Sequence, residues 1–109
     1  MSQPIPPEIA QQIRQLGNPL GAEPVGEWRP YLGLYVRDCH VKGGEMANPQ
    51  QTYLGIDVLQ GSDGGLRGPY ISVERAEKLS TSDARELMER ISTAIDDAEA
   101  YRLENSSTE

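Results

Sequence analysis

The clearest pattern of hydrophobic and polar positions in this chain lies between Ser80 and about Leu103. Apolar residues recur there at steps of three and four, the spacing of a stripe along one side of an α-helix. The stripe consists of Ala84, Leu87, Met88, Ile91, Ala94, Ile95 and Ala98. Ser80 suits the N-cap, because its hydroxyl can accept a hydrogen bond from an amide of the first turn. The pattern predicts an amphipathic helix that packs on strands earlier in the chain.

Three shorter segments alternate between apolar and other residues, which is typical of half-buried β-strands. They cover residues 31–36, 53–58 and 70–74, and their inward side chains are predicted to be Leu32, Leu34 and Val36, then Leu54, Ile56 and Val58, then Ile71 and Val73. The glycine-rich segment 61–65 is typical of a hairpin turn. How far the first strand continues through residues 39–41 stays open.

A second, shorter helix is predicted near the N-terminus. It begins at Pro7, carries Ile9, Ile13 and Leu16 on one side, and ends at Gly17. The Pro- and Gly-rich segment 18–29 is predicted to be a loop. The fold class is therefore α+β with the order α-β-β-β-α, a three-stranded antiparallel meander with the long C-terminal helix packed on one face.

The domain organisation follows from the same pattern. We expect a mobile arm over residues 1–6, a single α+β domain over residues 7–104 and a disordered polar tail over residues 105–109.

Composition and charge narrow the functional classes. Hydrophobic residues make up 37% of the 109 residues and Phe is absent, so we expect a small core. Such a chain is either a marginally stable monomer or one that completes its core by pairing with a second copy, and we favour the homodimer. The net charge of −7 disfavours direct binding of nucleic acid, because such affinity comes largely from Lys and Arg. The same charge is compatible with a basic protein partner.

Cysteine content and hydropathy bear on the compartment. Cys39 is the single cysteine, so an intrachain disulfide is impossible. No apolar run approaches the roughly 20 residues that span a bilayer, and no charged-then-apolar leader is present. We therefore expect a cytoplasmic protein without membrane association.

Few residues suggest catalysis or cofactor binding. Cys39 and His40 are neighbours on a predicted strand extension, so their side chains should point to opposite faces and not act on one another. The glycines from Gly61 to Gly68 lack the Lys and the following helix of a phosphate-binding loop. We expect no catalytic residues, no metal site, no cofactor and no enzymatic activity.

The outward strand positions form the first candidate surface. Four tyrosines and an aspartate are predicted to share the face that the helix leaves uncovered, and they are Tyr31, Tyr35, Tyr53, Asp57 and Tyr70. Tyrosine is enriched where proteins meet, so this face is a candidate protein interface and a candidate surface for self-association. The alternative is cross-strand stacking in which the rings cover neighbouring glycines.

The long helix carries the second candidate surface, an acidic face. It consists of Asp83, Glu86, Glu89, Asp96 and Asp97, which are predicted to lie opposite the apolar stripe, in water. The simplest interpretation is a solvated helix face. The alternative hypothesis is a phage-type inhibitor that uses this acidic helix to mimic nucleic acid on a basic host protein.

Two resemblances add context. Tyr70 to Glu74, followed by Ala76–Ser80, Ala84–Leu87, Ala94 and Asp96–Glu99, resembles the C-terminal part of small uncharacterised proteins of actinobacteria and their phages, which implies an accessory bacterial or phage protein. The order α-β-β-β-α resembles that of double-stranded-RNA-binding domains. Those domains carry a lysine cluster at the start of their last helix, where this chain has Ser80 to Asp83, so RNA binding is not implied.

Overall fold

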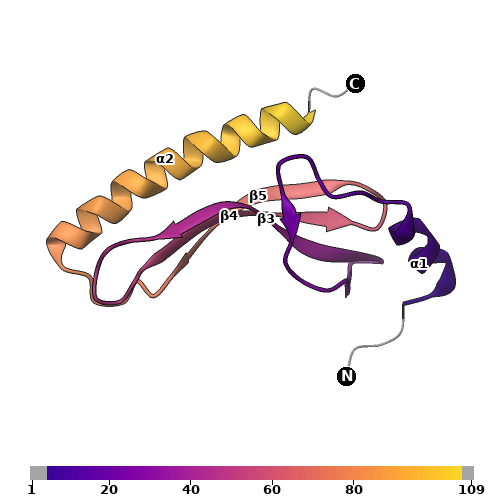
Figure 1. Ribbon diagram of the computed structural model, residues 1–109, viewed down its shortest axis with the longest axis horizontal. Coiled ribbons are helices and arrows are strands. Elements are labelled where there is room, and N and C mark those ends of the chain that lie inside the picture. The colour runs from indigo at the N-terminus through magenta and orange to yellow at the C-terminus, as the bar shows by residue number, and fades with distance from the viewer. Residues whose placement is uncertain (1–4, 107–109) are drawn as a thin grey trace.

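A computed structural model of the chain describes residues 5–106. Its elements are α1 (Pro7–Arg14), β1 (Glu23–Pro24), β2 (Arg29–Tyr31), β3 (Leu34–Glu45), β4 (Tyr53–Gly61), β5 (Leu66–Glu74) and α2 (Thr81–Ser106). The strands form one antiparallel sheet, and α2 runs along one face of it (Figure 1). The predicted α+β class and the order of helix, antiparallel strands and long helix are confirmed.

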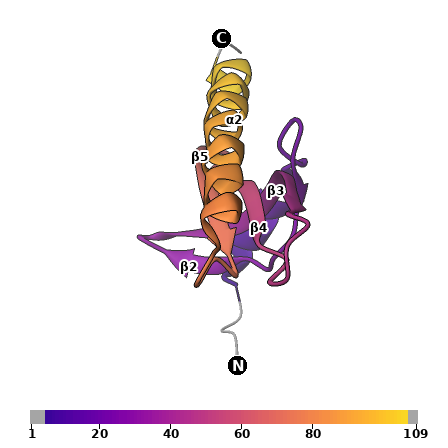
Figure 2. The same ribbon diagram turned by 90° about the vertical axis from the view of Figure 1, so that its left-hand side faces the viewer.

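The centre of the sheet is the meander β3-β4-β5, and β1 and β2 pair with the other side of β3. These two short strands lie within or next to segment 18–29, which was predicted to be a loop. Their two and three residues include Pro24 and Pro30, so they have no strand pattern of their own and depend on pairing with β3. Viewed end-on, α2 stands over β5, and β3 lies to one side (Figure 2).

The predicted start of the first strand is wrong. Leu32 and Gly33 form a two-residue turn between β2 and β3, and Tyr31 pairs with Leu34 across it. Both turn residues have positive φ, 48° and 86°, which is the geometry of a type I′ hairpin turn. Leu32 therefore does not point inward, and 83% of its surface is exposed.

β3 continues well beyond residue 41, and a β-bulge interrupts its pairing with β4. His40 pairs with Asp57 and Lys42 pairs with Ile56, so Val41 is the additional residue. The bulge places Val41 against the core and brings the next residue, Lys42, to the side of the sheet that faces α2.

The core beneath α2 is thin. Two adjoining clusters form it, one with Cys39, Val58 and Tyr101 and one with Ile56, Ala94 and Ala98. The buried hydrophobic residues of the described chain are Ala22, Val36, Cys39, Met46, Ile56, Val58, Ala94, Ala98 and Tyr101. The helix contributes two alanines and Tyr101 to this set, so its larger aliphatic side chains stay outside the fully buried core.

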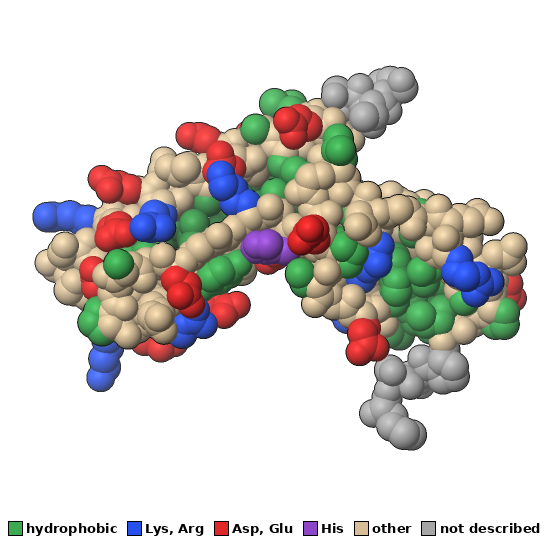
Figure 3. Space-filling model, in the orientation of Figure 1, with side chains coloured by type: hydrophobic (Ala, Val, Ile, Leu, Met, Phe, Trp, Pro, Cys, Tyr) green, Lys and Arg blue, Asp and Glu red, His purple; other side chains and the backbone are tan. Residues whose placement is uncertain are grey.

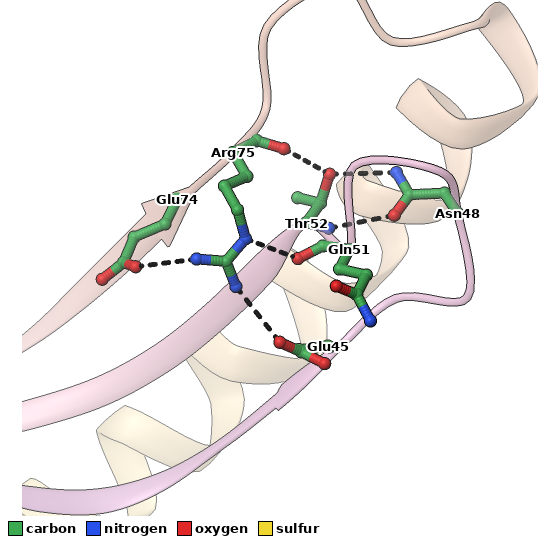
Figure 4. Close-up of polar contacts among 6 residues, drawn as sticks. All are labelled: Glu45, Asn48, Gln51, Thr52, Glu74 and Arg75. Atoms are coloured by element: carbon green, nitrogen blue, oxygen red, sulfur yellow. Dashed lines mark hydrogen bonds and ion pairs between the residues drawn. The ribbon is translucent and has the colours of Figure 1, made fainter.

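A polar cluster joins the β3–β4 loop to the segment that leads into α2 (Figure 4). Thr52 is fully buried, and its hydroxyl donates to the carbonyl of Arg75 at 2.6 Å. Asn48 contacts Thr52 through both ends of its amide, at 2.9 Å each. The Arg75 guanidinium donates to the carbonyl of Gln51 at 3.0 Å and forms an ion pair with Glu45 at 3.2 Å.

The boundaries of α2 largely match the prediction. The Ser80 hydroxyl accepts a hydrogen bond from the amide of Asp83 at 3.0 Å, which confirms the predicted N-cap. The helix continues to Ser106, two residues into the segment predicted to be a tail. Residues 107–109 of that tail and residues 1–4 of the predicted arm lie outside the described part of the chain.

α1 lies at the end of the sheet that is far from the start of α2 (Figure 1). None of its residues is buried, so its apolar side with Ile9 and Ile13 is only partly covered. Within residues 5–106, no helix combines the length and hydrophobicity needed to cross a membrane.

Candidate functional site

A cleft of about 530 Å³ lies between α2 and one edge of the sheet. Its floor is apolar and comes from Leu54 and Ile56 of β4 and Ala94 of α2. One wall is the end of β3 from Lys42 to Gly44. The other wall is a flank of α2 formed by Glu86, Glu89, Arg90, Thr93 and Asp97. Figure 3 shows hydrophobic surface between the charged side chains of α2 and the sheet.

Ion pairs border this cleft. Lys42 reaches across it and places its Nζ 2.9 Å from Oδ2 of Asp97, and Arg90 pairs with Glu86 along the helix at 2.9 Å. All four side chains are more than a third exposed, so each pair contributes little to stability. A ligand can therefore replace these contacts at low cost.

The β3 wall is also a strand edge with open backbone groups. Within the described residues, β3 pairs with β1 and β2 only up to His40, and beyond it only with β4. Gly44 has nothing within 4 Å of the position that a Cβ would take. The cleft thus combines a free strand edge, an apolar floor and space next to Gly44, which are the parts needed to add an extended segment to the sheet.

The face of the sheet opposite α2 carries most of the predicted tyrosine surface. The ring of Tyr53 lies flat along it, and its hydroxyl comes close to both Gly43 and Gly55, where a Cβ on Gly55 would be 2.7 Å away. Partial burial raises the pKa of the Tyr53 phenol, and the negative charges of Asp57 and Glu74 add to the effect. Tyr53 therefore covers glycines of its own sheet, as the stacking alternative predicted.

Asp57 lies at the centre of this open face and holds two other polar residues. Its Oδ1 is 3.1 Å from Nδ1 of His40, and its Oδ2 accepts a hydrogen bond from the Ser72 hydroxyl at 3.2 Å. A general base must contact the nucleophile directly, and here the carboxylate lies between His40 and Ser72. The cluster therefore links the His40 ring and the Ser72 hydroxyl through the Asp57 carboxylate, and the ring does not contact the hydroxyl itself.

The turn at Leu32 separates two of the predicted surface residues. Tyr31 pairs with Leu34, whereas Tyr35 pairs with Pro30, so successive pairs place the two tyrosines on opposite faces. Tyr31 lies on the open face with His40 and Tyr35 lies on the other. Tyr70 stands on the open face next to Asp57 on β4, and 51% of its surface is exposed.

Three of the five predicted acidic residues follow one flank of α2. Glu86, Glu89 and Asp97 line the cleft, and two of these three are paired with Arg90 and Lys42. Asp83 is half-buried near the start of the helix, and Asp96 is exposed. The flank therefore mixes both signs of charge at the cleft.

Cys39 and His40 occupy opposite faces, as predicted. Cys39 is fully buried beneath α2, and burial raises the pKa of its thiol above the ordinary range. A thiol that is neutral and inaccessible is a poor nucleophile. Within residues 5–106, no three His, Cys, Asp or Glu side chains come close enough to hold a metal ion.

Sequence reasoning did not find the cleft, because its parts come from three separate elements. The one available signal is the dipeptide Gly43-Gly44, which the structure places at the end of β3. Comparisons with known proteins add no relative: no family model, no curated protein and no solved structure matches the chain.

Proposed function

We propose that this chain is a small non-enzymatic protein-binding module that works as a homodimer. The observation that carries the proposal is the apolar surface that the thin core leaves exposed. On α2, Met88 is 70% exposed and Ile95 is 48% exposed, and on β5 Val73 is 39% exposed. Burying such side chains against a second copy is favourable.

Exposed apolar side chains are what a protein interface needs. A standard interface buries about 800 Å² on each partner, and its fully buried centre is more apolar than the rest of the surface. A second copy would thus supply contacts that the thin core lacks.

The cleft supports binding of a second, different protein. We propose that it takes an extended segment with alternating apolar and basic residues, the former on Leu54 and Ile56 and the latter toward Glu89. The strand edge of β3 offers backbone hydrogen bonds, and the net charge of −7 favours a basic partner. The free thiol of Cys39 fits a reducing compartment, so we place the protein in the cytoplasm.

Light scattering coupled to size exclusion tests self-association. We expect a mass near twice 12.0 kDa at tens of micromolar protein, falling toward the monomer on strong dilution. A mass of 12.0 kDa at every concentration would refute the homodimer.

A further inference from the structure

This inference rests on the proposed self-association and names its surface. The side chains of α2 fall into three stripes. Ala94, Ala98 and Tyr101 contact the sheet, and the charged flank faces the cleft and the edge of β3. The remaining flank therefore faces the other edge of the sheet, which is β5.

Between Ala84 and Ile95 this third stripe is apolar and uncharged, and further along the same flank Glu99 and Arg102 form an ion pair at 3.6 Å. The stripe consists of Ala84, Met88, Ile91 and Ile95, at steps of four, three and four along the helix. Met88 and Ile95 are 70% and 48% exposed, and the other two are partly exposed. α2 stands over β5, the last strand of the sheet (Figure 2), so within the described residues no further strand lies beyond β5 on this side of the helix.

β5 itself is an open edge directly below the stripe. Within the described residues it pairs only with β4. Its side toward α2 carries Ile71 and Val73, which pair with Ile56 and Leu54 of β4, and Val73 is 39% exposed. An apolar helix flank and an unpaired strand edge thus adjoin one another on the same side of the molecule.

We propose that two copies of the chain associate about a two-fold axis through their β5 edges, with the apolar flanks of the two α2 helices packed against each other. A strand edge is self-complementary under two-fold symmetry, because antiparallel pairing is the same in both directions. Each copy carries a net charge of −7, so copies repel unless they meet at uncharged surface. The stripe of α2 and the side of β5 below it provide such a surface.

The conformation of β5 sets the register. Pro69 has no amide hydrogen, and Arg75 has a φ of 58°, so the regular edge runs from Tyr70 to Glu74. Its centre is Ser72. Two-fold pairing of the whole segment places Ser72 opposite the Ser72 of the second copy. Ile71 then lies opposite Val73 of the second copy, on the same side as the helices.

Mass measurements on two matched variants test the surface. Met88→Glu places a charge on the stripe, and we expect at least a tenfold weaker dimer. Leu32→Glu makes the same kind of change at an equally exposed position of the β2–β3 turn and should leave the dimer intact. Circular dichroism checks that both variants are folded, which their exposure of 70% and 83% favours.

Cross-linking tests the register. We expect oxidised Ser72→Cys to run as a covalent dimer on non-reducing gels, since paired Cα atoms about 5 Å apart suit a disulfide. Thr93→Cys, on the opposite flank of α2, should remain monomeric on the same gel. A wild-type chain that never dimerises refutes the proposed homodimer. The proposed surface alone is overturned by a different result: the wild type is a dimer, Met88→Glu leaves that dimer intact and Ser72→Cys does not cross-link. If Tyr53→Ser then dissociates the dimer, the two copies meet through the face of the sheet that carries Tyr53.

Discussion

At the scale of single residues, two titratable side chains buried in the core make the stability of the fold depend on pH. Burial raises the pKa of the Cys39 thiol and of the Tyr101 phenol, which lie in one cluster beneath α2. The folded chain therefore keeps both protons at pH values where the unfolded chain has begun to lose them. Unfolding releases protons in that range, so the free energy of unfolding falls as the pH rises.

We expect this loss of stability to begin near pH 9, where the thiol of the unfolded chain ionises. It should continue at higher pH, where the tyrosine of the unfolded chain ionises. Urea unfolding at pH 7, 9 and 10 measures it. The double variant Cys39→Ala/Tyr101→Phe should lose less stability between pH 7 and pH 10 than the wild type. Equal losses in the two proteins would show that other groups govern the alkaline response.

Tyr101 also offers a separate test at neutral pH. Its hydroxyl is buried without a hydrogen bond of standard geometry within the described residues, although the Asn105 side chain is close enough to lower its pKa, so Tyr101→Phe should change the free energy of unfolding by no more than about 1 kcal/mol. Tyr101→Ala removes the ring from the core and should cost about 3–5 kcal/mol. Thermal or urea unfolding of both variants distinguishes the two contributions of this side chain.

Thr52 tests the polar cluster at the other end of the sheet. Thr52→Val keeps the shape but removes the donor to the Arg75 carbonyl and the contact with the Asn48 amide. We expect a loss of about 1–3 kcal/mol, because buried partners are left without a hydrogen bond. Ser82→Ala, at an exposed position, is the control, and a similar change in both variants would contradict the role of the cluster.

At the scale of elements, the sequence predicted what depends on local pattern. The apolar steps of three and four located α2, and Ser80 marked its start, because capping and periodicity act within a few residues. The turn at Leu32 was missed because alternation alone does not distinguish a strand from a tight turn flanked by strands. Gly33 was the local signal for it. β1 and β2 could not be predicted, because they exist only through pairing with β3, and the cleft could not, because it forms between β3, β4 and α2.

Two residues of α2 separate packing within one chain from packing between copies. Leu87 is half-buried on the sheet side of the helix and Ile91 belongs to the outer apolar stripe. We expect Leu87→Ala to cost about 2 kcal/mol or more at any protein concentration. Ile91→Ala should cost less in dilute solution and more at concentrations where the dimer forms. Parallel urea titrations at two concentrations measure the difference, and identical behaviour of the two variants would contradict the assignment.

At the scale of the whole molecule, α2 divides two kinds of surface. Its apolar stripe from Ala84 to Ile95 meets the open edge of β5, and its charged flank meets the open edge of β3 across the cleft. The dimer proposed for the first leaves the second accessible on both copies, with the acidic residues facing outward. This arrangement combines self-association with binding of a second protein, because the two surfaces do not compete.

Salt distinguishes the two proposed uses of the charged flank. An extended segment bound along β3 relies on backbone hydrogen bonds and the apolar floor, so its affinity should fall only a few-fold between about 50 and 500 mM salt. Mimicry of nucleic acid relies on the acidic residues and should weaken steeply over the same range. Lys42 and Arg90 already neutralise two of the three acids at the cleft, which favours the weak response. Calorimetry with an extended peptide of alternating apolar and basic residues measures this salt dependence of the affinity. Gly44→Val fills the space next to the strand edge and should abolish binding if the peptide lies along β3.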